Sequence, residues 1–188
     1  MAKPAADTCA TRHAPQPFDE VLRLGSLTTH APADLAHRIS LGIRLTPEAD
    51  ALAEVRWIVG DPTHAIVSDQ RHTLLADIRN QLGAWFKHPT NAFRLPLAAP
   101  RTLFQAKLRD ALCKTRPGET MTYGDLAKQL HSAPRAVGQA LGSNPLPLIV
   151  PCHRIIAAGK NRLTGFNHAS DGPMLMLKAW LLEQEAHA

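Results

Sequence analysis

A cysteine followed directly by a histidine is the most chemically suggestive feature of this sequence. Cys152 and His153 stand in the segment PLIVPCHRII, directly behind a run of aliphatic residues. Burial beside such residues makes an unassisted thiol less acidic and therefore inert. A neighbouring imidazole can reverse this effect by accepting the thiol proton. The segment therefore predicts either an unreactive thiol packed in the core or an activated nucleophile.

An activated nucleophile would require a bend in the chain and a third side chain beside the imidazole. Neighbouring side chains of an extended strand point to opposite faces, so Cys152 and His153 can meet only where the chain turns. Pro151 precedes the pair and permits such a turn. A carboxylate on the far side of the imidazole would fix its tautomer and stabilise its charge, and Glu185 is the candidate. Considered alone, a Cys-His pair is more often core packing, because free cysteines are commonly buried.

Composition narrows the class of protein. The 188 residues are 45% hydrophobic, enough for one medium domain or two small ones with an ordinary core. The first residues lack the apolar stretch of a signal peptide, and no apolar run approaches the roughly 20 residues that span a membrane. We therefore expect a soluble, cytoplasmic protein. The net charge of +5 is compatible with a polyanionic partner.

The other cysteines have weaker patterns. Three widely spaced cysteines without a CxxC pair argue against a disulfide framework and for a reducing cytosol. Cys113 lies at the border between the polar and apolar faces of its helix, which indicates packing. Cys9 has His13 nearby and His30 further on, but one cysteine with scattered histidines is a weak zinc pattern, so we predict no metal site.

The first half of the chain, residues 1–90, is predicted to be an α/β scaffold domain. The β-prone runs VRWIVG and AIVS, separated by Gly60, Asp61 and Pro62, indicate a small antiparallel sheet with one hairpin near residue 61. Apolar residues from Leu74 to Phe86 then recur at three-to-four residue spacing, which is typical of a helix. Residues 91–100, rich in proline, have the composition of a linker.

The second half, residues 101–188, is predicted to be a mostly α-helical domain. Thr102 is the expected N-cap of its first helix, and Thr122 with Asp125 resembles a capping box. Ser132 is expected to cap the next helix, APRAVGQALG. Two short helices joined by a tight turn form a helix-turn-helix. A final helix, PMLMLKAWLLEQEA, carries Lys178 and Glu185 on one face.

The helix APRAVGQALG is unusually thin. Small residues such as Ala136 and Gly138 allow another surface to approach closely, either a packed helix or the minor groove of DNA. Arg135, near its start, would be the projecting charge. A helix that reads sequence in the major groove should carry several long polar side chains, and here only Arg135 and Gln139 qualify.

Together these residues resemble the O6-alkylguanine-DNA alkyltransferases, also called methylated-DNA-protein-cysteine methyltransferases. The resemblance is strong over residues 100–186 and rests on the segments MTYGDLA, RAVGQALGSNPLPLIVPCHRII, LTGF and KAWLLEQE, in family order. The first half matches only in length and coarse pattern, where the family has an α/β domain similar to ribonuclease H. The PCHR box with an upstream RAVG helix and an Asn-Pro pair is far more specific than a lone Cys-His.

The resemblance implies a single-turnover DNA repair protein that acts as a monomer without a cofactor. It would bind duplex DNA through the minor groove and rotate an alkylated base out of the stack. It would then accept the alkyl group of O6-alkylguanine, and of O4-alkylthymine, on its own cysteine. A soft, strong nucleophile suits substitution at carbon, and a thiolate is the best that side chains offer. The resulting thioether has no easy leaving group.

The resemblance also implies roles residue by residue. Cys152 would be the nucleophile and His153 its general base through a water, with Glu185 polarising His153. Asn144 would hold the active-site turn and support the thiolate network. The residues expected to bind the substrate nucleotide or the DNA are Tyr123, Arg135, Ala136, Gly138, Phe166, Asn167 and Lys178.

Among these, Tyr123 would line the nucleotide pocket and offer its hydroxyl to the leaving base. Arg135 would fill the gap left by the rotated base. Lys178 could equally be an ordinary solvated helix residue. Two other functions remain open. One is a non-catalytic protein that recognises alkylated bases, in which the cysteine would be replaced. The other is a regulator that reads an operator sequence.

Overall fold

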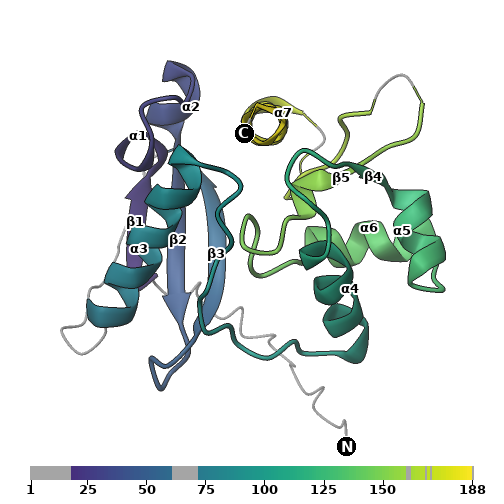
Figure 1. The fold of residues 1–188 in the computed structure, drawn as a ribbon, viewed down its shortest axis with the longest axis horizontal. Helices are drawn as coiled ribbons and strands as arrows, with labels where there is room; N and C mark the ends of the chain where they lie inside the picture. Colours follow the sequence, from purple (N-terminus) through teal and green to yellow (C-terminus); the bar gives the residue numbers. More distant parts are fainter. Residues whose placement is uncertain (1–17, 61–71, 160–161, 168, 170, 188) are drawn as a thin grey trace, which may run out of the picture.

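The computed structural model describes residues 18–60, 72–159, 162–167, 169 and 171–187 (Figure 1). Three strands, β1 (Glu20–Arg23), β2 (Ile39–Leu45) and β3 (Leu52–Val59), form an antiparallel sheet in the order β1-β2-β3. Two short helices, α1 (Leu24–Leu27) and α2 (Ala33–Arg38), connect β1 to β2. The small antiparallel sheet expected for the first half is therefore confirmed.

Strand β3 contains all of the predicted run VRWIVG except its final glycine, but its hairpin lies elsewhere in the chain. The chain turns between β2 and β3, where Ala49 adopts a φ of 59° and the Thr46 hydroxyl donates to Asp50 over 2.6 Å. The segment AIVS and the hairpin expected near residue 61 lie outside the described residues. Strand β2 was not predicted, because the run ISLGIRL is buried at nearly every position and shows no alternation.

Helix α3 (His72–Lys87) confirms the helix predicted from its periodic apolar residues. One side of it is buried in the same core as the sheet and contributes Leu75, Ile78, Leu82, Trp85 and Phe86. The pattern ends where His88 and Pro89 follow, since proline cannot continue a helix. The last turn of this helix carries Trp85, which packs against His153 of the candidate active site described below.

The segment 91–100 is hydrogen-bonded to the sheet along part of its length. The amide of Leu52 donates to the carbonyl of Pro96 over 2.7 Å, and the amide of Ala98 donates back to Leu52 over 2.9 Å. The chain is thereby attached to the outer edge of β3 before it enters the second half. The division into two domains at this segment stays a prediction.

The second half is mostly helical, as expected. It contains α4 (Leu103–Cys113), α5 (Tyr123–Gln129), α6 (Pro134–Gly142), the 3₁₀ helix η2 (Cys152–Arg154) and α7 (Gly172–Ala186). A two-stranded parallel ladder joins β4 (Met121–Thr122) to β5 (Ile155–Ile156). Helices α5 and α6 are joined by residues 130–133, which gives the helix-turn-helix. No described helix is both long enough and apolar enough to cross a bilayer.

Two of the three predicted helix caps are confirmed, and one is wrong. The Thr102 hydroxyl accepts from the amide of Gln105, and Thr122 accepts from the amide of Asp125, each over 3.1 Å. The N-cap of α6 is Ala133, without a side-chain hydrogen bond, rather than Ser132. A residue before proline avoids the helical conformation, so the helix can begin only at Pro134.

The two halves share a single core. Phe86 of α3 stacks on Trp180 of α7, with ring centroids 5.8 Å apart. The amide of Val55 in β3 donates to the carbonyl of Pro145, in the loop after α6, over 2.8 Å. Figure 1 shows α7 end-on between the sheet and helices α4 to α6. The first half is therefore positioned to influence the residues around Cys152.

Truncation of Phe86 should destabilise the whole protein. The side chain is fully buried, and Phe86→Ala should lower the free energy of unfolding by about 3–5 kcal/mol through lost burial and a residual cavity. Urea unfolding would measure this. Leu103→Ala is the control, because Leu103 is 84% exposed and should change stability by less than about 0.5 kcal/mol. Similar losses for both variants would contradict a shared core across the two halves.

Candidate active site

The chain turns sharply at the cysteine. Pro151 has φ and ψ of −77° and 65°, and the next three residues form the 3₁₀ helix η2. The amide of Cys152 donates to the carbonyl of Val150 over 2.7 Å, and the amide of Arg154 to that of Pro151 over 3.2 Å. Cys152 and His153 are both buried. The bend that the sequence required for a joint role is therefore present.

Asn144 holds the loop that leads to this turn. Its side-chain amide donates to the carbonyl of Val150 over 3.0 Å, and its side-chain oxygen accepts from the amide of Leu146 over 3.1 Å. The first bond joins the two ends of the loop, and the Val55–Pro145 bond attaches the start of the loop to β3. The amide of Asn144 also faces the Cys152 thiol closely enough to favour its ionised form.

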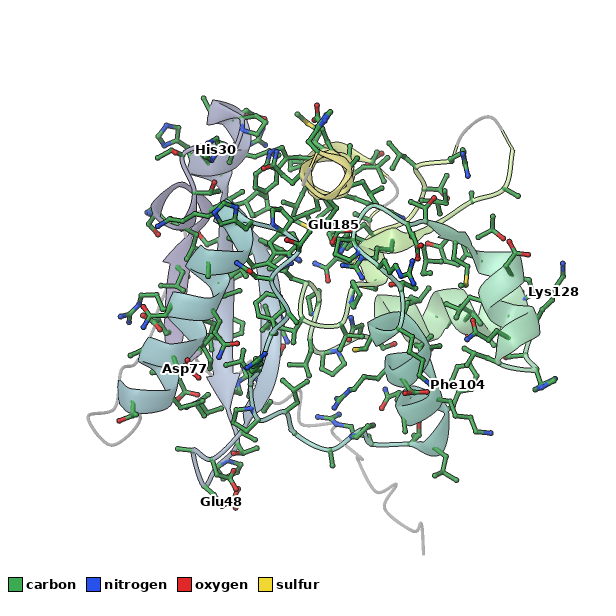
Figure 2. All side chains as sticks on the ribbon, in the orientation of Figure 1. His30, Glu48, Asp77, Phe104, Lys128 and Glu185 are labelled. Carbon is green, nitrogen blue, oxygen red and sulfur yellow. The ribbon has the colours of Figure 1, made fainter. Side chains whose placement is uncertain are left out.

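His153 and Glu185 form a buried hydrogen-bonded pair. His153 Nε2 lies 2.9 Å from Glu185 Oε1, and neither side chain is exposed to solvent. Figure 2 shows Glu185 on the side of α7 that faces the interior. The amide of Gly118 donates to the second carboxylate oxygen over 3.3 Å. The carboxylate expected from the sequence is thus beside the imidazole.

Arg154 is a second partner of this carboxylate that was not expected from the sequence. Its Nε donates to Glu185 Oε2 over 2.9 Å and its Nη2 to Oε1 over 2.8 Å. Its Nη1 donates to the carbonyl of Thr115 over 2.6 Å and to the Thr115 hydroxyl over 3.0 Å. The guanidinium therefore ties α7 to the end of α4. Its place in the PCHR box was the only sequence signal for this role.

The hydrogen bonds determine the tautomer of His153. Burial alone would raise the pKa of Glu185, but hydrogen bonds from His153 and Arg154 outweigh burial and hold this pKa at about 2. An ionised carboxylate can only accept hydrogen bonds, so Nε2 of His153 must carry the proton. Nδ1 then presents the basic lone pair, and among the described residues it has no hydrogen-bond partner. The imidazole can take up a proton only at Nδ1.

Burial keeps both members of the Cys-His pair neutral in the free protein. Burial raises the pKa of the Cys152 thiol, and the Asn144 amide and the Lys178 ammonium oppose this only in part. The pKa of His153 is also lowered, first by burial and then by the charges of Arg154 and Lys178, although Glu185 opposes this change. The imidazole therefore does not ionise the resting thiol, in contrast to the activated nucleophile that the Cys-His pair could also indicate. Desolvation in the closed core outweighs the relay.

Cys152 lies at a small pocket of about 100 Å³. The pocket is bounded by α5, by α6 and by the loop before α7, and its lining residues are Tyr123, Gly138, Leu141, Gly142, Cys152, Gly165, Phe166 and Asn167. Four of the predicted substrate residues therefore gather around the thiol: Tyr123, Gly138, Phe166 and Asn167. Burial, followed by the charge of Cys152, raises the pKa of the Tyr123 hydroxyl, so this group stays protonated and can donate.

Lys178 is buried rather than solvated. Its ammonium donates to the carbonyl of Ile155 over 2.6 Å and to those of Thr164 and Gly165 over 3.0 and 3.1 Å. The nitrogen also lies 5.9 Å from the centre of the Tyr123 ring. Burial lowers the pKa of Lys178 to about 8, and Cys152 opposes that change. The lysine thereby holds one wall of the pocket against β5.

Small residues are needed where this wall meets Tyr123. Gly165 has a φ of 58°, and a Cβ there would lie 3.3 Å from the Tyr123 hydroxyl oxygen. A Cβ on Gly138 would lie 3.9 Å from the Tyr123 ring, which is ordinary contact. The backbone conformation and the close approach both favour glycine at position 165.

Two predicted DNA-binding residues lie outside the pocket. Arg135 is exposed in the first turn of α6, and Ala136 follows it, half-buried. Neither residue lines the pocket, but both are on the helix whose inner side closes it. The structure therefore separates a solvent-facing group on α6 from the group around the thiol.

The remaining cysteine and metal predictions have different outcomes. Cys113 is exposed, so the prediction that it packs in the core is wrong. The helix ends at this residue, which leaves its side chain in solvent. Cys9 and His13 lie outside the described residues, and His30 is exposed. Within the part of the chain that the structure describes, no cluster of three His, Cys, Asp or Glu side chains could hold a metal ion.

Residues 103–187 match the family "6-O-methylguanine DNA methyltransferase, DNA binding domain". The methylated-DNA–protein-cysteine methyltransferase of Methanocaldococcus vulcanius is 48% identical over 82 residues, which cover 44% of this chain and 47% of the relative. The protein of the same name from Archaeoglobus fulgidus is 36% identical over 106 residues, which cover 56% of this chain and 71% of that relative. The chain thus spans only about half the length of the Methanocaldococcus relative.

Solved structures are similar over more of the chain. The Mycobacterium tuberculosis OGT in complex with DNA superimposes with a TM-score of 0.60 at 32% identity, over 79% of this chain and 86% of that one. The O6-methylguanine DNA methyltransferase of Methanococcus jannaschii gives 0.59 at 28% identity, over 80% and 90%. The sheet of the first half is therefore part of the similarity, in addition to the helical second half.

The free energy of unfolding should fall at acidic pH because Glu185 becomes protonated. Its pKa is about 2 in the folded protein, against 4.5 when unperturbed, so its stabilising effect is complete above pH 4.5 and is lost as pH falls towards 2. Each pKa unit is worth about 1.4 kcal/mol, so the loss should be on the order of 3 kcal/mol. Urea unfolding measured between about pH 5 and about pH 2.5, where the folded protein is still populated, would follow this loss. Glu185→Gln is the control and should show a flatter pH dependence; an equal dependence would contradict the assignment.

Proposed function

The chain belongs to the methylated-DNA–protein-cysteine methyltransferase family, and from this membership we propose that it repairs DNA by transferring an alkyl group from a damaged base to Cys152. The observation that carries the proposal is the position of Cys152. The thiol lines a pocket, and the next residue is hydrogen-bonded to a buried carboxylate. A non-catalytic relative would have no need of this pair.

The substrate is O6-alkylguanine in duplex DNA, and O4-alkylthymine is a second substrate of the same chemistry. The alkylated oxygen of either base lies within the stack, so the nucleotide must rotate out before a buried thiol can reach it. The exposed Arg135 would occupy the space that the base leaves. The thin α6 would lie in the minor groove, where its small side chains permit close approach.

The reaction begins with a proton transfer that the substrate must trigger. In the free protein the thiol and the imidazole are both neutral. His153 takes the Cys152 proton at Nδ1, through a water. Its Nε2 keeps its own proton and its hydrogen bond to Glu185. The resulting imidazolium is stabilised by the Glu185 carboxylate, as in other nucleophile–base–carboxylate relays.

The thiolate then displaces the base. A sulfur lone pair forms the bond to the alkyl carbon, and the bond from that carbon to O6 breaks, leaving its electron pair on the guanine. Tyr123 lines the pocket with a protonated hydroxyl, which would donate to the developing negative charge. The product is a thioether on Cys152. It has no easy leaving group, so each molecule acts once.

Transfer should be stoichiometric and confined to one thiol. Incubation with a duplex containing O6-methylguanine should add one methyl group to the peptide that carries Cys152, as read by mass spectrometry. Cys152→Ala should abolish the addition and still bind the duplex. Cys113→Ala is the matched control and should be methylated like the wild type, because that thiol is exposed on α4. An unmodified wild-type protein that binds the alkylated duplex would instead indicate a non-catalytic reader.

Arg135 should matter only when a base must leave a stack. We expect Arg135→Ala to slow transfer from the duplex by roughly tenfold or more, since base extrusion costs a few kcal/mol. Transfer from free O6-benzylguanine should be unchanged. Arg116→Ala, at an exposed arginine outside α6, is the control and should leave both rates near those of the wild type. Equal losses on the two substrates would rule out a role in extrusion.

A further inference from the structure

The catalytic imidazole is in contact with an aromatic residue from the first half of the chain. The ring of Trp85, on α3, packs against the ring of His153 in a T-shaped arrangement, with centroids 6.4 Å apart and planes at 76°. Trp85 is 3% exposed and His153 is fully buried. The family match over residues 103–187 does not include α3. The second half of the chain therefore does not complete the surroundings of His153 by itself.

The Trp85 ring is itself held in place by two other aromatic rings. Phe93, in the segment after α3, stacks on it at 6.3 Å with an interplanar angle of 18°. Phe86 packs on it edge-on at 5.2 Å. The Phe86 ring also stacks on Trp180 of α7. An indole packed in this way has little freedom to rotate away from His153. The cluster of Trp85, Phe86, Phe93 and Trp180 thus links α3 to α7.

We infer that Trp85 is a positioning residue for His153, which fixes the plane of the imidazole and excludes water from it. The inference rests on the proposed function, because orientation matters only if Nδ1 must accept a proton. The hydrogen bond to Glu185 fixes one point of the ring but leaves rotation about that bond possible. A rigid ring against the side of the imidazole removes that freedom. Nδ1 is then directed by packing as well as by the carboxylate.

The charged groups that act on His153 all belong to the second half. Among the described residues these groups are Glu185 and Lys178 of α7 and Arg154 of η2. The contact from α3 is an uncharged indole. Loss of the indole would therefore leave these charges in place and admit water. Since burial is the main reason that the pKa of His153 is low, hydration should raise that pKa.

The sign of the effect on activity follows from the role of His153. Only the neutral imidazole can take the thiol proton. If its pKa rises, a larger share is protonated at a given acidic pH, and transfer slows there. We therefore expect Trp85→Leu to move the acid limb of the transfer rate to higher pH, by about one pH unit. At alkaline pH the rate should approach that of the wild type.

Two measurements on the full chain test this inference. The first is the titration of His153 by NMR, with labelled histidine, in the wild type, Trp85→Leu and Trp57→Leu. Trp57 on β3 is the matched control, because it is also 3% exposed and no ring contact with His153 is recorded for it among the described residues. The second is the pH profile of transfer from free O6-benzylguanine to the same three proteins.

A higher pKa of His153 in Trp85→Leu, with no change in Trp57→Leu, would support the inference. An unchanged pKa in both variants, or the same rise in both, would overturn it. If Trp85→Leu does not fold, Trp85→Phe is compared with Trp57→Phe and judged by the same criterion. The NMR titration does not require alkyl transfer. A wild type that fails to transfer would therefore remove the proposed function, while the comparison of the variants would still decide the role of Trp85.

Discussion

The active site depends on one buried negative charge, the carboxylate of Glu185. An isolated charge in a protein core is costly, and it is tolerated only with well-placed partners. Here the Arg154 guanidinium donates to the carboxylate through both Nε and Nη2, and Nε2 of His153 and the amide of Gly118 donate one hydrogen bond each. The end of α7, the loop after α4 and the 3₁₀ helix at the cysteine therefore meet at this carboxylate. Removing one partner of such a pair typically costs about 3–5 kcal/mol, which gives the site a strict geometry.

This arrangement gives Glu185 a structural role and, in the proposed mechanism, a chemical one. Burial would raise the pKa of Glu185, but hydrogen bonds from His153 and from Arg154 lower it and keep the carboxylate ionised. The imidazole can then gain and lose a proton at Nδ1 without a change at its other nitrogen. A relay built on a carboxylate with no arginine would be more sensitive to protonation of that carboxylate. The buried carboxylate thus stays ionised and hydrogen-bonded to Nε2 while one proton moves to or from Nδ1.

Burial also explains why a reactive cysteine can be carried safely. An exposed thiolate would react with many electrophiles, and a protein that acts once could not be restored. In the free protein the thiol is protonated, and the small pocket restricts access to it. Lys178 maintains this pocket by holding the carbonyls of Thr164 and Gly165. In the proposed mechanism, reactivity appears only when a base fills the pocket and completes the path for the proton.

The local sequence was sufficient to predict the helices with strong periodicity, two of the three caps and the pairing of His153 with Glu185 beside Cys152. These features depend on short-range spacing or on a specific motif such as PCHR. The cap at Ser132 was predicted incorrectly because Pro134, two residues later, restricts the residue between them. Strand β2 was missed because a strand that is buried on both faces loses the alternation that identifies it.

Only the tertiary structure decided how the parts of the active site interact. Whether Lys178 is solvated, whether Arg154 shares the carboxylate and whether Trp85 contacts His153 all depend on contacts between segments far apart in the chain. The ionisation of Cys152 also belongs to this class, because it is set by the balance between burial and nearby charges rather than by the neighbouring residue in the sequence. Residue types and their spacing determine which chemistry is available. Packing determines the dielectric surroundings, and with them the protonation state from which that chemistry starts.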